Sequence, residues 1–202
     1  MDHAPGPHSP HSPLVGAPSE VARTPAPPID WTALPPALKR ELRASHVGEA
    51  VAVRLYDGVA DATGDAAARL FARKHREVEL THLSRLRALV PEGEESRLVG
   101  LLSAGGWLMG WLPAKLGPHR FYTVLASVEQ WVDTHYARQI DIARRHGAPD
   151  GLVRLLQACR NDEAHHAEDG WALAGRPDAL ARALAWVAVS SSRLGVALAR
   201  RV

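Results

Sequence analysis

Apolar residues recur every three or four positions through most of the chain after Pro36, which is the spacing of one face of an α-helix. The pattern is interrupted at residues 63–65, at Pro91 and at Gly147 and Pro149, where residues that typically begin or end helices occur. It predicts helices over about 36–62, 66–89, 120–145 and 150–172, and a final helix after Asp178. Alternating patterns typical of β-strands are nearly absent, so the predicted fold class is all-α.

The connections between these helices indicate how they pack. The first and second helices are joined by a tight link, as are the third and fourth, so the members of each pair should be antiparallel. Residues 91–117 instead form one long connection between the second and third helices, which is typical of a ferritin-like bundle. We therefore expect residues 35–202 to form a ferritin-like four-helix bundle with this crossover and an additional C-terminal helix.

Residues 1–34 differ from the rest in composition. They are rich in Pro, Gly, Ser and Ala and have no apolar periodicity, so we expect a disordered extension. His3, His8 and His11 are compatible with a weak metal-binding tract, although scattered histidines more often belong to a plain linker. Arg23 is alone in this region, whereas a mitochondrial presequence carries repeated arginines, and this favours a bacterial protein.

The charge and cysteine content exclude several classes of function. The formal net charge is only +2, and the basic residues are scattered among 22 acidic residues, so we expect no nucleic-acid partner. Cys159 is the only cysteine, which excludes both a disulfide within the chain and a cysteine-based zinc site.

Two segments suggest contact with a membrane surface. The sequence LVGLLSAGGWLMGWLPA (98–114) has no charged residue and two tryptophans, but it is shorter than the roughly 20 residues that span a bilayer. Its glycines and proline weaken a straight helix, so we expect a segment lying in the membrane interface. The sequence RALAWVAVSSSRLGVALARRV (182–202) adds apolar residues with arginines placed to meet headgroups. The alternative is that both segments pack over the bundle as ordinary core.

Two Glu-x-x-His pairs carry the candidate chemistry. Glu79 and His82 are three residues apart on the second predicted helix, and Glu163 and His166 have the same spacing on the fourth. Residues at this spacing lie side by side on a helix, and two such pairs on different helices are what a dinuclear metal site in a bundle requires. The competing register, Asp162 with His165, would break the match between the two helices.

The other two helices each supply one glutamate within an apolar stripe, Glu49 and Glu129. Four carboxylates in a core would be prohibitive unless two divalent cations neutralised them, so a metal site is the simplest interpretation. The expected ligands are Glu49, Glu79, His82, Glu129, Glu163 and His166, with His165 facing outward.

Other residues near these positions have expected supporting roles. Asp162 precedes Glu163 and should accept a hydrogen bond from a metal-bound imidazole, that of His82 rather than that of His166. Asp133 is a second candidate for the same role, with an outward salt bridge as the alternative. Tyr56 and Tyr136 are expected to line the cavity and take part in catalysis, with core packing as the alternative.

The segments that carry these residues resemble a known family. ELRASHVGEAVAVRLYDG (41–58), SVEQWVDTHYARQI (127–140), DEAHH (162–166) and the Glu-x-x-His of the second helix together resemble the demethoxyubiquinone hydroxylases, di-iron monooxygenases of ubiquinone biosynthesis. The resemblance covers about residues 36–202. It implies that the six residues above bind two iron ions per chain, and that the protein attaches peripherally to a membrane, at the cytoplasmic face of the inner membrane in a bacterium.

The resemblance also implies a reaction, the O2-dependent hydroxylation of the ring of a prenylated demethoxyubiquinone or quinol. NADH is then the expected electron source, and a homo-oligomer or a biosynthetic complex remains open. Two alternatives use the same fold without this reaction. One is a di-iron protein that oxidises iron or another substrate, and the other is a non-catalytic, membrane-associated helical bundle.

Overall fold

The computed structural model describes residues 19–201, and every regular element in that range is an α-helix. The prediction of an all-α fold is therefore confirmed. The helices are α1 (Glu20–Arg23), α2 (Pro36–Ala62), α3 (Ala66–Arg87), α4 (Val99–Lys115), α5 (Pro118–Arg145), α6 (Asp150–Ala174) and α7 (Ala179–Ala199).

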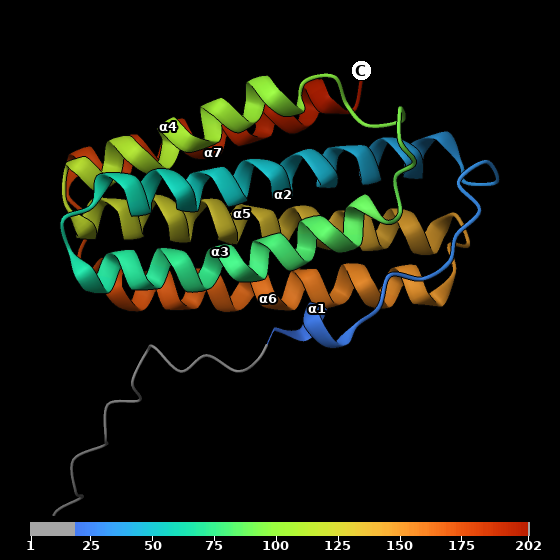
Figure 1. Cartoon of the computed structure of the whole chain (residues 1–202), viewed down its shortest axis with the longest axis horizontal. Coiled ribbons are helices and arrows are strands. Elements are labelled where there is room, and N and C mark those ends of the chain that lie inside the picture. Colours follow the sequence, from blue (N-terminus) through green and yellow to red (C-terminus); the bar gives the residue numbers. More distant parts are fainter. Residues whose placement is uncertain (1–18, 202) are drawn as a thin grey trace, which may run out of the picture.

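Helices α2, α3, α5 and α6 form the expected four-helix bundle, and the short links make α2 and α3, and α5 and α6, antiparallel neighbours (Figure 1). The side chain of Asp65 accepts a hydrogen bond from the amide of Ala68, which fixes the start of α3. Gly147 has a φ of 64°, a conformation that glycine adopts without strain, and it ends α5. The cap at Asp65 and the turn at Gly147 keep the links short, so the two helices of each pair pack side by side.

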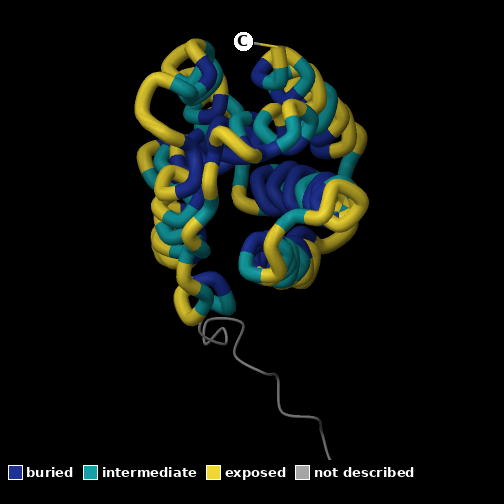
Figure 2. Tube along the Cα trace, turned by 90° about the vertical axis from the view of Figure 1, so that its right-hand side faces the viewer, coloured by how far each residue is buried: buried dark blue, intermediate teal, exposed yellow. Residues whose placement is uncertain are grey.

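Buried residues gather between the helices, and exposed residues cover their outer faces (Figure 2). Two apolar clusters fill the bundle. One contains Leu42, Leu86 and Leu155, and the other contains Leu55, Phe71 and Leu125. The glutamates of the four helices fall between these clusters along the chain, so the polar site is enclosed by core on both sides.

Helices α4 and α7 form a further layer over α2 and α5 (Figure 1). The glycines and the proline of α4, which are expected to weaken a straight helix, do not interrupt it, and two of the glycines allow a close approach to α2. A Cβ atom at Gly110 would lie 1.9 Å from the carbonyl oxygen of Leu55, and one at Gly106 would lie 2.5 Å from that of Val51. One face of α4 therefore packs directly on the backbone of α2.

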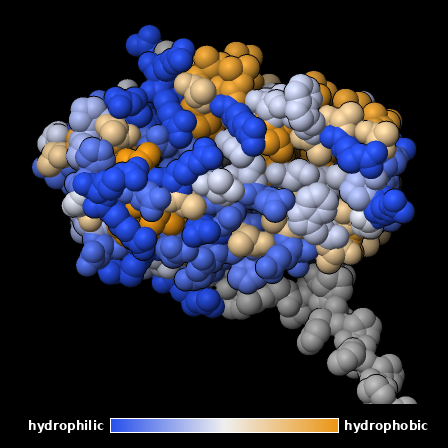
Figure 3. Space-filling view, turned by 180° about the vertical axis from the view of Figure 1, so that it is seen from behind, coloured by the Kyte–Doolittle hydropathy of each residue, from blue (hydrophilic) through white to orange (hydrophobic). Residues whose placement is uncertain are grey.

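The outer faces of α4 and α7 remain apolar. Leu101 is 72% exposed and Trp186 is also 72% exposed, and apolar side chains gather on this part of the surface (Figure 3). Over residues 19–201, none of the helices combines the length and the apolar character needed to cross a bilayer.

The expected disordered extension up to residue 34 is wrong for residues 19–34, which pack on the bundle. Val21 is fully buried, and Trp31 and Leu34 are each 8% exposed, in the same cluster as Leu42. Single apolar residues fill gaps at the bundle surface without any periodicity, so the pattern could not predict their burial. The histidine tract at residues 3, 8 and 11 lies outside the described residues.

Candidate metal centre

The four bundle helices direct one glutamate each, and two of them also a histidine, into one buried site. Each of these six residues is at most 5% exposed. On α3 and α6 the glutamate and histidine are one turn apart, so both side chains point the same way. The site therefore contains Glu49, Glu79, His82, Glu129, Glu163 and His166.

The six residues form two overlapping groups of four. One group contains Glu49 and His82, the other contains Glu129 and His166, and both contain Glu79 and Glu163. Within each group, the oxygen and nitrogen atoms available as ligands all lie within 4.8 Å of one another. Because Glu79 and Glu163 belong to both groups, the arrangement could hold two neighbouring metal ions.

The two imidazoles present the same nitrogen to the acids. Nδ1 of His82 lies 3.2 Å from Oε1 of Glu163 and 3.4 Å from Oε2 of Glu49. Nδ1 of His166 lies 2.9 Å from Oε1 of Glu79 and 3.4 Å from Oε2 of Glu163. Both rings thus face the centre of the site with the atom that would bind a metal.

Several of these buried atoms lie close to one another, but their geometry gives them no hydrogen bond among the described residues. They are both carboxylate oxygens of Glu79, Oε2 of Glu163, and Nδ1 of His82 and of His166. Buried polar atoms are normally hydrogen-bonded, and a cluster of buried carboxylates is unfavourable unless cations compensate its charge. Carboxylate oxygens with imidazole nitrogens suit a divalent transition metal such as iron, so the residues present could hold metal ions.

The surroundings shift the pKa values within the site. Burial opposes charge on His82 and His166, but the neighbouring acids outweigh it and raise the pKa of each imidazole well above its usual range. Burial, together with the charges of Glu163 and Glu79, raises the pKa of Glu129. The shifted pKa values of the two imidazoles and of Glu129 therefore all favour the protonated forms.

The two tyrosines donate hydrogen bonds to carboxylates of the site. The Tyr56 hydroxyl lies 2.9 Å from Oε1 of Glu129, and the Tyr136 hydroxyl donates to Oε1 of Glu49. Tyr136 also lines the adjoining pocket, but Tyr56 is fully buried behind Glu129 and does not, contrary to expectation. Its ring fills core space next to Glu129, so only the hydroxyl reaches the site.

The residues around Glu163 have the expected register. His166 is buried, whereas His165 is exposed and its Nδ1 lies 2.7 Å from the backbone oxygen of Asn161. Oδ2 of Asp162 lies 3.2 Å from Nε2 of His82, on the side of the ring away from the other acids. Asp133 does not approach either imidazole, because it pairs with Arg160 at 2.8 Å, which corrects the expectation of a supporting role and matches the alternative of a salt bridge.

His75 is a part of the site that the sequence pattern did not assign. Its ring stacks on that of His166, with centroids 4.6 Å apart, and its Nε2 lies 3.4 Å from Asp169. Burial lowers the pKa of His75 well below the usual range, so this ring is neutral. The spacing of seven residues between His75 and His82 places both on one face of α3, which is the signal that could have identified it.

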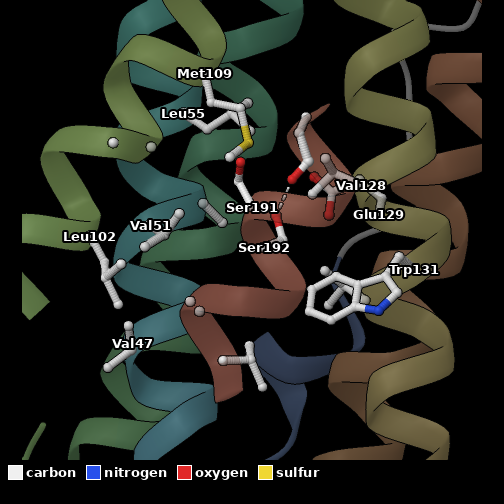
Figure 4. Close-up of a pocket in the computed structure, with 18 of the residues that line it drawn as sticks. Val47, Val51, Leu55, Leu102, Met109, Val128, Glu129, Trp131, Ser191 and Ser192 are labelled. Carbon is white, nitrogen blue, oxygen red and sulfur yellow. Dashed lines mark hydrogen bonds between the residues drawn. The ribbon is translucent and has the colours of Figure 1, made fainter. Parts of the chain in front are cut away.

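A pocket of about 400 Å³ leads to the site between α2, α4, α5 and α7. Its walls are almost entirely apolar, with Val47, Val51 and Leu102 among them, and the hydroxyls of Ser191 and Ser192 enter it from α7 (Figure 4). Its lining also includes Glu49, Glu129 and Glu163, so the pocket reaches the carboxylates. The arrangement can hold a long apolar molecule with one end at the metal centre.

Comparison with known proteins gives a consistent result. The sequence model of the family described as "Ubiquinone biosynthesis protein COQ7" matches residues 36–199. A 3-demethoxyubiquinol 3-hydroxylase of Azoarcus sp. (strain BH72) is 31% identical over 138 residues, 67% of this chain and 66% of that protein. Another, of Paracidovorax citrulli (strain AAC00-1), is 30% identical over 174 residues, 82% of each chain.

A more distant relative comes from an animal. The protein named NADPH-dependent 3-demethoxyubiquinone 3-hydroxylase, mitochondrial, of Caenorhabditis elegans is 22% identical over 169 residues, 82% of this chain and 90% of that protein. The part of this chain that matches the family model, residues 36–199, contains all six residues of the buried site. The segment 19–34 precedes the matched part.

Proposed function

Because this chain belongs to the ubiquinone biosynthesis protein COQ7 family, we propose that it is a di-iron monooxygenase that hydroxylates the ring of a demethoxyubiquinol in ubiquinone biosynthesis. One observation carries the proposal. Two groups of buried ligand atoms share Glu79 and Glu163, and they meet the inner part of an apolar pocket.

Glu49 and His82 would hold one iron, Glu129 and His166 would hold the other, and Glu79 and Glu163, which belong to both groups, would contribute to both. Two iron ions bound in this way would supply the redox chemistry that activates oxygen for insertion into an aromatic C–H bond. The hydroxyls of Tyr56 and Tyr136 hold the carboxylates of Glu129 and Glu49, and so fix the directions in which these ligands point.

The pocket provides the substrate part of the proposal. A prenylated ring is almost entirely apolar, and it matches walls formed by side chains such as Val51, Leu55 and Val128. Its ring would lie beside Glu129 and its tail would extend between α4 and α7. Filled in this way, the pocket excludes water from the reacting carbon.

The reaction requires electrons from outside the chain. One oxygen atom enters the ring C–H bond and the other leaves as water, which consumes two electrons and two protons. We propose a reduced nicotinamide nucleotide, NADH or NADPH, as their source. The name of the Caenorhabditis elegans relative supports this class of donor.

The exposed apolar faces of α4 and α7 support attachment to a membrane surface. Leu101 and Leu108 project from α4, and Trp186 and Leu194 from α7, with Arg193 exposed beside them. A substrate too apolar to leave the bilayer would then enter the pocket directly between these two helices. In a bacterium this membrane would be the inner membrane, at its cytoplasmic face.

Iron analysis and quinone profiling test the proposal together. We expect the purified full-length protein, loaded anaerobically with Fe(II), to hold about two irons per chain. A strain lacking the gene should accumulate a quinone without one methoxy group, and the wild-type gene should restore the mature quinone. Iron binding without this accumulation would leave a di-iron protein with another substrate, and absence of iron would leave a non-catalytic bundle.

A further inference from the structure

The segment that precedes the bundle contacts the carboxylate behind His82. The Ser19 hydroxyl donates to Oδ2 of Asp162 at 2.6 Å, the Glu20 amide donates to Oδ1 at 2.8 Å, and the Val21 amide donates to Oδ2 at 3.1 Å. The same carboxylate lies 3.2 Å from Nε2 of His82. Asp162 is thus enclosed by three donors from residues 19–21 and one from the imidazole.

These contacts determine what His82 can offer to a metal. A metal-bound imidazole normally donates its second N–H group to a carboxylate, which fixes both the ring orientation and the tautomer. With Nε2 held by Asp162, Nδ1 of His82 remains directed at Glu49 and Glu163. The three donors from residues 19–21 hold the Asp162 carboxylate in place.

The segment is itself anchored, so its donors have little freedom to move. The Val21 side chain is fully buried. The Asn161 side chain donates to Oε2 of Glu20 at 2.8 Å, and the Arg85 guanidinium reaches the backbone oxygen of Ala22 at 3.4 Å. The anchors come from both α3 and α6, the two helices that carry the Glu-x-x-His pairs.

The second imidazole has a different environment. Within residues 19–201, the carboxylates within 4 Å of His166 are Glu79 and Glu163, which belong to the site itself. Its ring stacks on His75 instead of resting on an aspartate. The two halves of the site therefore differ in how their histidines are supported.

We infer that Ser19, Glu20 and Val21, which we call the N-terminal clamp, are positioning residues for the iron bound by His82. They act through Asp162 and do not touch the metal. The inference rests on the proposed di-iron centre and adds to it a segment that lies before residue 36, where the family match begins. The N-terminal clamp should therefore affect the iron bound by His82 and not the iron bound by His166.

Paired variants of the full-length protein separate the clamp from a general effect on stability. Ser19→Ala removes the hydroxyl donor, and Ser19→Thr restores one. Glu20→Pro and Glu20→Ala both lose the Glu20 carboxylate. Only Glu20→Pro also loses the backbone N–H group that donates to Asp162. Proline fits the first position of a helix, and the extended Ser19 before it (ψ 132°) tolerates a following proline.

The measurement is the release of Fe(II) to a chelator in the iron-loaded protein, together with its Mössbauer spectrum. Loss of a residue that orients a ligand typically weakens metal binding by about 10- to 100-fold. The clamp acts one step further away, so we expect Ser19→Ala and Glu20→Pro to speed the release of one of the two irons several-fold. The quadrupole doublet of that iron alone should change, whereas Ser19→Thr and the control Thr24→Ala should match the wild type. Glu20→Ala loses the anchor to Asn161 but keeps the amide, so it should release iron more slowly than Glu20→Pro.

The possible results distinguish the clamp from the metal centre. If Ser19→Ala and Glu20→Pro release both irons at the wild-type rate, or both irons equally faster, the clamp has no specific role and the inference is overturned while the di-iron centre stands. If the wild-type protein binds no iron, the proposed function fails and the inference fails with it.

Discussion

At the scale of single residues, Glu163 belongs to both groups of ligand atoms, so its loss affects both proposed irons. Glu163→Gln keeps the shape of the side chain but replaces an anionic oxygen by an amide, and we expect it to abolish both iron binding and hydroxylation. His165→Ala changes the neighbouring histidine, which is exposed, and should preserve both. Iron content and turnover of the two variants distinguish the pair Glu163 and His166 from the alternative pair Asp162 and His165. Loss of iron in His165→Ala but not in Glu163→Gln would exclude Glu163 and His166 as ligands.

The protons held by the metal-free site give a second prediction at this scale. The raised pKa values of His82 and His166 mean that both imidazoles are protonated near neutral pH, and the raised pKa of Glu129 favours its neutral form. A ligand must lose its proton before it binds a metal. Metal uptake should therefore release protons, and the apparent affinity should rise with pH.

Anaerobic titration with Fe(II) in a weakly buffered solution, followed by a pH electrode, measures this release. Affinities determined at pH 6.5 and 7.5 should differ in favour of the higher pH. An affinity independent of pH would contradict the assignment of protonated histidines at the site. The His165→Ala protein should release as many protons as the wild type.

The two Glu-x-x-His pairs could be predicted because helical spacing places their members one turn apart on the same face, and Glu49 and Glu129 could be predicted because each interrupts an apolar stripe. Other roles could not, because they depend on contacts between elements. Asp133 pairs with Arg160 of α6, and Ser19 bonds Asp162 across 143 positions of the sequence. No local pattern contains either relation.

At the scale of elements, the contact between α4 and α2 depends on glycines with no room for a side chain. A Cβ atom at Gly106 would lie 2.5 Å from the carbonyl oxygen of Val51, whereas one at Gly105 meets nothing within 4 Å. We expect Gly106→Ala to destabilise the protein by about 1 to 3 kcal/mol, the usual cost of overpacking. Gly105→Ala should instead be neutral or stabilising by up to about 1 kcal/mol, because alanine favours a helix.

Thermal unfolding of the two neighbouring variants measures this difference under identical conditions. Equal midpoints for both would show that α4 does not rest on the backbone of α2. The pair is matched in chemistry and differs by one position, so helix propensity affects both variants alike.

The bundle helices were predictable from sequence because each has a strong apolar stripe and clear ends, and the start and end of α2 agree with expectation. Helix α4 was harder to predict, since it is apolar on nearly all sides and rich in glycine, features that do not separate a helix from an irregular segment. Residues 19–34 were missed for the opposite reason, because they have too few apolar positions to form a pattern.

At the scale of the whole molecule, apolar side chains are concentrated on the layer of α4 and α7 (Figure 3). If this layer meets the bilayer, Leu101→Ser should weaken binding to phospholipid vesicles by about 10- to 100-fold, since burying a leucine side chain contributes roughly 1.5 to 3 kcal/mol. Leu70→Ser removes a leucine that is 44% exposed on α3, in the layer farthest from α4, and should have no effect. Co-sedimentation with vesicles compares the two, and equal losses would place the membrane contact elsewhere.

The glycine contact between α2 and α4 also bears on which molecules the pocket accepts. Helix α2 carries Glu49, and α4 rests on its backbone, so the wall beside the reacting end is held at a fixed depth from the metal ligands. Farther out, the pocket is lined by side chains of α4 and α7 such as Leu102 and Val187, and no such glycine contact with a facing backbone fixes its width there. We therefore expect strict discrimination among head groups of different bulk and broad tolerance for tails of different length.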